Sequence, residues 1–398
     1  MIIKLEGKRY MSKTGISRAI LFFVMVVLWF AMYAYTPYVN PQLIVMGVSA
    51  SVMGLIGGAY GFTQLILRIP VGVTADRWQM KFFICAGCLC AGLAALCMIL
   101  FHNPVGFLAG RALGGVAASS WVPGTVLYTR YYRPDQATRS ITMINLANQL
   151  GRMISFLMAG IFAARFGPMS AFILSTVGGF AAFGISLFIH EEKTPSGSTS
   201  LTIRELLAVG KERNLLIAST LAISVQLITF ATISTFTMNH AVVIGANAAQ
   251  LGYLLVALFI PAIILSFCLS KFILQRIDAK KLVVLGFVVF ALYCLLVTYT
   301  STVWQLYLVQ ILGGIGNTLT FSLLMGLGVL RIPTEKRGAA MGFYQSVYAI
   351  GMVIGPLIMG FITDLTNLRI GFLVMTVLAV ISTAATVLFL KSARPTPK

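Results

Sequence analysis

Long apolar segments constrain this chain more than any other feature, because each is long enough to cross a lipid bilayer. We find twelve of them, each of about 20 residues or more. Only 10% of the 398 residues are charged and 59% are hydrophobic, whereas about a quarter of the residues of a soluble protein are charged. Backbone groups inside a bilayer have no water to bond, so the spans are helices or a closed barrel, and segments of this length favour helices. The predicted spans are 16–38, 49–73, 82–101, 104–130, 138–163, 168–190, 214–242, 247–274, 281–300, 303–330, 338–363 and 369–390.

The longest polar stretch divides these spans into two sets of six. It covers residues 191–213, and we interpret it as a cytoplasmic linker between an N-terminal bundle, 1–190, and a C-terminal bundle, 214–398. The fold class predicted is therefore an all-α integral membrane protein with two pseudo-symmetric six-helix bundles. A repeated motif supports the duplication, because Arg111-Ala-Leu-Gly114-Gly115 returns 199 residues later as Gln310-Ile-Leu-Gly313-Gly314.

Basic residues collect on one side of the predicted spans. Of 29 Lys and Arg residues, 24 fall in the termini, in the loops that would face the cytoplasm or at the span ends beside them, whereas only Arg165 and Arg369 fall in or beside the opposite loops. This bias places both termini in the cytoplasm. It also explains the formal net charge of +19 without a nucleic-acid partner. We expect a monomer in the bilayer of a bacterial cell (inner) membrane.

Charged residues within the spans are exclusively basic. All ten acidic residues lie in loops or near span ends, whereas Arg68, Arg111 and Arg152 lie inside spans. An embedded charge is costly in lipid and marks a substrate or ion pathway. Arg68 has Gln64 four residues before it on the same helical face.

Arg152 is nearest the middle of its span, and Asn145 and Gln149 share its helical face. We favour a functional role for Arg152, whereas Arg111 is equally suited to packing or gating, and Arg68 is near enough to the span end to extend its side chain towards water. The full set of candidate substrate-binding residues is Tyr33, Gln64, Arg68, Arg111, Asn145, Gln149, Arg152, Gln226, Gln310, Asn317, Tyr344, Gln345 and Tyr348.

Enzymatic and metal chemistry have little support in the spans. They contain no buried acid pair, no His cluster and no His-x-x-x-His, and the Cys-x-x-Cys of Cys85 and Cys88 has neither a second pair nor a nearby His. We therefore expect no enzyme activity, no cofactor and no metal site.

One charged loop resembles a known signature. The stretch Arg68–Lys81 is similar to the loop between helices 2 and 3 of the major facilitator superfamily of transporters, although Gln79 and Met80 stand where the family usually has Gly and Arg. The residues that carry the match are Gly72, Asp76, Arg77 and Lys81. The resemblance implies a gate, in which Asp76 pairs with Arg77 or Arg130 and holds one conformation.

Two further motifs extend the resemblance. Arg111 with Gly114 is similar to the arginine motif of span four, and Gly351-x-x-x-Gly355-Pro356 is similar to the Gly-Pro motif of the family, although here it lies in span eleven and not in span five. The family implies a substrate site between the two halves near the middle of the bilayer, and transport by alternating access.

The function expected is secondary active transport of a small anionic or zwitterionic organic solute. The alternative within transport is export of neutral or lipophilic compounds of the multidrug type, since a single arginine can be purely structural. Substrate identity, direction of transport and coupling ion have no signal in the sequence.

Overall fold

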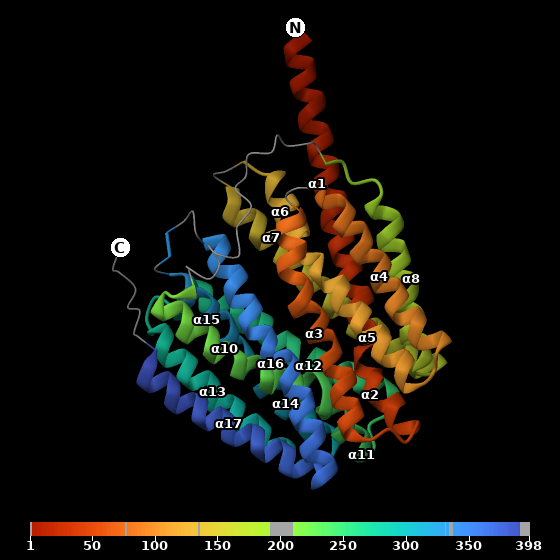
Figure 1. Ribbon diagram of the computed structural model, residues 1–398, viewed down its shortest axis with the longest axis vertical. Coiled ribbons are helices and arrows are strands. Elements are labelled where there is room, and N and C mark those ends of the chain that lie inside the picture. The colour runs from red at the N-terminus through yellow and green to blue at the C-terminus, as the bar shows by residue number, and fades with distance from the viewer. Residues whose placement is uncertain are drawn as a thin grey trace. The chain divides into compact units, whose positions relative to one another are not determined.

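The computed structural model consists of helices joined by short turns, and no strand occurs among the residues it describes, which are 2–75, 78–133, 136–191, 210–330, 332–333 and 337–390. Twelve helical segments within these ranges are long and apolar enough to cross a membrane, which confirms the predicted fold class. Figure 1 shows their arrangement. The helices are α1 (Ile2–Ala34), α2 (Thr36–Val45), α3 (Ala50–Ala75), α4 (Met80–Leu100), α5 (Pro104–Ser119), α6 (Trp121–Arg130), α7 (Ala137–Phe166), α8 (Met169–Ser186), α10 (Arg213–Ala231), α11 (Thr237–Val243), α12 (Ala248–Cys268), α13 (Ala279–Val297), α14 (Val303–Asn317), α15 (Leu323–Val329), α16 (Arg337–Leu365) and α17 (Leu368–Phe389).

Three π-helical turns interrupt the C-terminal spans. They are η2 (Thr232–Phe236), η3 (Leu269–Ile273) and η4 (Thr318–Ser322), and each joins directly onto an α-helix. A π turn makes i→i+5 bonds and accommodates one residue more than an α turn. Hydrophobic periodicity does not reveal such turns, and the sequence analysis missed them.

The first span is longer than predicted. We expected it to end at residue 38, but the spanning segment runs over Gly15–Val45. Residue 40, which lies beyond the predicted end, is an asparagine whose side chain is buried and hydrogen-bonded. Its amide nitrogen donates to Asn239 Oδ1 at 2.7 Å and to the Thr235 carbonyl at 3.0 Å. A buried amide with partners is compatible with a spanning segment.

Contacts divide the chain into two compact units. Unit 1 comprises Met1–Thr36 and Ile66–Ser200, and unit 2 comprises Pro37–Leu65 and Leu201–Lys398. In unit 1, α1 packs on α7 and α8, and α4 packs on α5 and α8. In unit 2, α10 packs on α16 and α17, and α13 packs on α14 and α17. The two units thus use the same pairs of helices.

Matched lysines show the repeat at the level of single contacts. In unit 1 the Lys81 ammonium donates to the Leu187 carbonyl just beyond α8, at 2.7 Å. In unit 2 the Lys280 ammonium donates to the Val387 carbonyl in the last turn of α17, at 2.8 Å. Each lysine lies at the start of its own helix and satisfies a carbonyl that a helix end leaves open.

Matched glycines repeat in the same way. Gly151 of α7 lies so close to α1 that a Cβ there would meet the Val26 carbonyl oxygen. Gly351 of α16 lies as close to the Ile223 carbonyl oxygen of α10. Small residues allow this approach, and membrane helices associate through such packing.

Within unit 2, the first half of α3 packs on α16. Glycines form this contact, since a Cβ at Gly54 or Gly61 would meet backbone atoms of Pro356 or Met352. Gly54 and Gly61 therefore lie on a packing surface. At its end the Asp364 carboxylate accepts from the amides of Ala50 and Ser51, at 2.8 and 2.7 Å, and so caps α3.

Candidate functional site

Arg152 is held over an aromatic ring in the middle of unit 1. Its guanidinium carbon lies 4.1 Å from the centroid of the Tyr33 ring. The neighbouring Gly151 brings α7 against α1 between Val26 and Phe30. The side chain of Arg152, the next residue of α7, then lies on Tyr33 of α1. Two of the residues predicted from sequence, Tyr33 and Arg152, are thus in direct contact.

Aromatic side chains continue on both sides of Tyr33. The Trp29 ring lies 5.7 Å from it, and the Phe156 ring lies 5.9 Å from it in an edge-to-face arrangement. Trp121, at the start of α6, packs edge-on against Trp29 at 5.4 Å. The result is a row of four rings from α1, α6 and α7, with one cation on it. We call Trp29, Tyr33, Trp121, Arg152 and Phe156 the Arg152 cluster.

Arg152 is the one charged side chain of the Arg152 cluster. Among the described residues, the acidic side chains of Glu191, Glu212, Asp278 and Asp364 all lie at or just beyond helix ends. A cation over an aromatic face gains about 2 kcal/mol when water is removed.

The other embedded arginines of unit 1 are buried and bonded differently. Arg111, on α5, lies within hydrogen-bonding reach of the Tyr35 hydroxyl, between α1 and α2. Arg68 is buried on α3. On α7, Asn145 is exposed and Gln149 is half-buried. Arg111 thus interacts with Tyr35, and the choice between packing, gating and ligand contact stays open for this residue.

The predicted residues of unit 2 form smaller groups. The Thr229 hydroxyl on α10 donates to Asn317 Oδ1 on α14, at 3.4 Å. Tyr344 and Tyr348 of α16 pack edge-to-face at 5.6 Å, and both rings contact Phe321 of η4. Of the remaining candidates, Gln64, Gln226 and Gln310 are buried, and Gln345 is half-buried.

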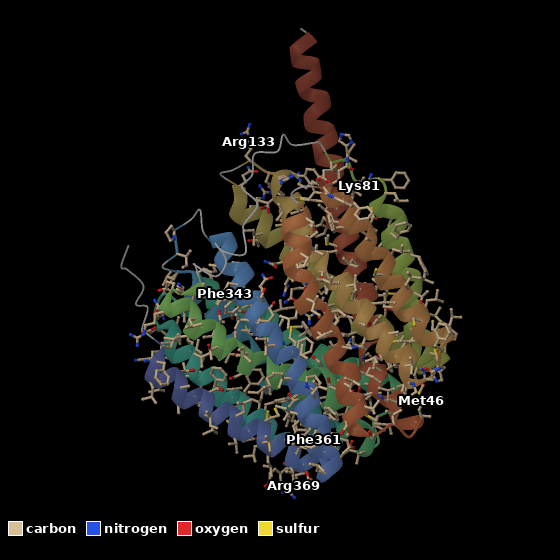
Figure 2. The ribbon with its side chains drawn as sticks, in the orientation of Figure 1. Met46, Lys81, Arg133, Phe343, Phe361 and Arg369 are labelled. Carbon is tan, nitrogen blue, oxygen red and sulfur yellow. The ribbon has the colours of Figure 1, made fainter. Side chains whose placement is uncertain are left out.

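The residues predicted to form a gate are only partly described. Asp76 and Arg77 lie outside the described residues, Gly72 belongs to α3, and Arg130 is exposed at the end of α6. Lys81 lies at the same end of unit 1 as Arg133 (Figure 2). The pairing predicted for Asp76 stays a prediction.

Glu191 supplies a contact that the sequence analysis missed. Its carboxylate accepts from the amides of Met80 and Lys81, at 3.0 and 2.7 Å, and so caps α4 across unit 1. A negative group at a helix N-terminus is stabilising. No local sequence motif predicts this cap, because 110 residues separate Glu191 from Lys81.

Sequence reasoning also missed three residues of the Arg152 cluster. Trp29 precedes Tyr33 by four residues, so the helical period indicates that they share a face. Trp121 and Phe156 approach only through tertiary packing. Among the described residues no group of three His, Cys, Asp or Glu side chains is arranged as metal ligands.

A family model provides the assignment. The model of the Major Facilitator Superfamily matches residues 21–242 and again residues 215–398. The chain belongs to this superfamily. The predicted resemblance is confirmed, and the protein is a membrane transporter of this family whose subfamily is not assigned.

The chain is similar in sequence to transporters and in fold to solved transporter structures. An MFS-type transporter of Methanocaldococcus jannaschii is 24% identical over 330 residues, covering 81% of this chain and 85% of the relative. The multidrug resistance protein MdtG of Salmonella dublin is 25% identical over 331 residues, covering 81% and 82%. A crystal structure of the nucleoside transporter NupG superposes with a TM-score of 0.78 at 14% identity, covering 95% of this chain and 100% of that chain. At this identity the structural likeness concerns the fold alone.

Proposed function

We propose that this protein is a secondary active transporter of small anionic or zwitterionic organic solutes, with Arg152 as the anion-binding residue. The observation that carries the proposal is the guanidinium of Arg152 over the Tyr33 ring, 4.1 Å from its centroid. Two six-helix halves, 1–190 and 214–398, joined by the 191–213 linker, would alternate access to the solute. Both termini and the linker would be cytoplasmic, as the distribution of basic residues indicates.

The chemistry of Arg152 supports an anion. The aromatic ring lies against one face of the planar guanidinium, whose N–H donors point outward in the plane of the group. Carboxylates and phosphates match these donors with two parallel hydrogen bonds. Lysine has a point charge and no such fork, so it would substitute poorly.

A second candidate function is export of neutral or lipophilic compounds. The similarity to MdtG, whose name describes multidrug resistance, favours it. The row of rings beside Arg152 also suits a lipophilic solute. In this case the charge of Arg152 would serve packing and not recognition.

Binding measurements on Arg152→Gln separate the two candidates. A thermal-shift screen of the purified protein over carboxylates, phosphates, peptides and neutral drugs identifies ligands. For an anionic ligand the substitution is expected to weaken binding about tenfold or more, or about 1.4 kcal/mol, and Arg152→Lys to recover only part. Arg165→Gln is the matched control, because Arg165 lies on the same helix but is exposed at its end. If Arg152→Gln binds anions as tightly as the wild type does, and the protein also binds neutral drugs, export of neutral compounds would be the better-supported function.

A further inference from the structure

The indole nitrogen of Trp29 is a donor without a hydrogen-bond acceptor. The side chain is 6% exposed, and Nε1 is buried with no partner among the described residues. A buried N–H that lacks an acceptor costs about 1–3 kcal/mol, so such groups are rare in folded proteins. An orphaned donor beside an embedded cation indicates that an acceptor from outside the chain belongs there.

The same aromatic ring connects Trp29 to Arg152. Tyr33 contacts the Trp29 ring at 5.7 Å and the Arg152 guanidinium at 4.1 Å. The Trp29 ring also meets Trp121 at an interplanar angle of 75°, and an N–H directed at an aromatic face is a weak interaction. A carboxylate oxygen is a far stronger acceptor for this N–H.

The rings define the rest of the ligand. Trp121 lies beyond Trp29 at one end of the row, and Phe156 lies beyond Tyr33 at the other. Phe156 is only 1% exposed, whereas Tyr33 and Trp121 are partly exposed, so these two rings are the ones that a ligand can contact. Aromatic groups pack against such rings in offset or edge-to-face geometry and gain about 0.5–1.5 kcal/mol beyond the area that they bury. An aliphatic acid of the same size would forgo this gain.

We propose that the Arg152 cluster recognises a planar aromatic carboxylate. One carboxylate oxygen accepts from the Arg152 guanidinium, the other accepts from Trp29 Nε1, and the aromatic body packs against the partly exposed rings of Tyr33 and Trp121. This inference rests on the proposed function and narrows its solutes to aromatic acids. It makes Trp29 a substrate-binding residue that discriminates by a hydrogen bond as well as by contact area.

Three probes of similar size test the inference by calorimetry on the purified, detergent-solubilised protein. They are 2-naphthoate, which has both the aromatic ring and the charge, decahydronaphthalene-2-carboxylate, which has the same carbon skeleton and charge without aromaticity, and 2-naphthol, which has the aromatic ring without the carboxylate. The wild type is expected to bind 2-naphthoate about twofold to tenfold more tightly than decahydronaphthalene-2-carboxylate. This comparison needs no variant and so does not depend on the folding of a mutant.

Trp29→Phe keeps a ring and removes the donor. The substitution is expected to weaken the binding of 2-naphthoate about threefold to tenfold. The affinity for 2-naphthol is expected to stay within about twofold of the wild-type value. Trp304→Phe is the control, since this tryptophan is 75% exposed at the start of α14 and packs only on Tyr307 among the described rings. Its affinity for each probe is expected to equal that of the wild type.

The outcomes separate the inference from the proposed function. Equal binding of the two acids, with Trp29→Phe unchanged and Arg152→Gln impaired, would overturn aromatic selection but leave anion transport standing. The absence of 2-naphthoate binding to the wild type at millimolar concentration would overturn the inference as well. Unchanged binding of both acids to Arg152→Gln would overturn the proposed function itself.

Discussion

Gly151 is the residue that brings Arg152 within reach of Tyr33. A Cβ at this position would meet the Val26 carbonyl oxygen and would lie 2.9 Å from Trp29 Cβ. Gly151→Ala is therefore expected to push α7 from α1 and to destabilise the protein by about 1–3 kcal/mol, as overpacking does. Thermal unfolding in detergent measures it. Gly184→Ala is the control, because no atom lies within 4 Å of a Cβ there. Equal melting temperatures of the two variants would contradict the close packing.

Tyr33 is expected to act through its ring and not through its hydroxyl. Tyr33→Phe preserves the face on which Arg152 lies, whereas Tyr33→Leu removes it. The leucine variant should lose about 1 kcal/mol of stability, and the phenylalanine variant should match the wild type. Chemical denaturation of both variants provides the comparison. An equal loss of stability in both variants would assign the effect to the hydroxyl. The cation–ring contact would then make no measurable contribution to stability.

For single residues, the sequence predicted the embedded charge of Arg152 better than it predicted the side chains around it. Arg152 stood out because a charge in the middle of an apolar span is rare. Its ring partner Tyr33 was also among the predicted residues, but Trp121 and Phe156 were not. Spacing along one helix reveals neighbours on that helix, whereas contacts between helices depend on packing that no local pattern encodes.

Among the elements, α3 depends on a cap from a distant part of the chain. Asp364 at the end of α16 accepts from Ala50 and Ser51 at the N-terminus of α3. Asp364→Ala removes both acceptors and is expected to cost about 1 kcal/mol and to let the first turn of α3 fray. A cysteine at Ser51 should then react faster with a water-soluble maleimide.

Glu212→Ala is the matched control for Asp364→Ala. Glu212 caps only its own helix, α10, by accepting from Leu215 at 2.7 Å. Its removal is expected to leave the reaction rate at Ser51→Cys unchanged. Acceleration by both substitutions would attribute the effect to general destabilisation, and acceleration by neither would show that the cap does not hold α3.

The presence of the membrane-spanning helices was predictable from the sequence, whereas the end of the first span and several helix caps were not. Hydrophobic length found all twelve spans, because the bilayer requires about 20 apolar residues for each helix. The continuation through Asn40 was missed, since a buried amide and an exposed one look alike in sequence. Caps such as Glu191 were missed for the same reason as Trp121, because they join elements far apart in the chain.

For the whole molecule, the distribution of charge predicts which ends face the cytoplasm. Arg133 lies at the Lys81 end of unit 1, and Arg369 lies with Phe361 at the end of unit 2 opposite Phe343 (Figure 2). In a cysteine-free background, Arg369→Cys in intact cells is expected to react with an impermeant maleimide, and Arg133→Cys only after the cells are opened. Reaction of Arg133→Cys in intact cells would invert the topology.

The three π turns also change how the repeat is counted along the chain. Ile223 contacts Gly351 as Val26 contacts Gly151, and these two partners are 197 residues apart. Gly47 and Gly245, which both have positive φ, are 198 residues apart. The matched lysines Lys81 and Lys280 are 199 residues apart, and the matched glycines Gly151 and Gly351 are 200 apart.

Each increase of one falls between matched pairs that flank η2, η3 or η4, and a π turn accommodates the one additional residue of the second half. Counted with these additional residues, Met352 takes the place of Arg152, and Phe230 takes the place of Tyr33. The second half therefore has an aromatic residue but no cation at the matching positions, and the anion site proposed at Arg152 has no basic counterpart there.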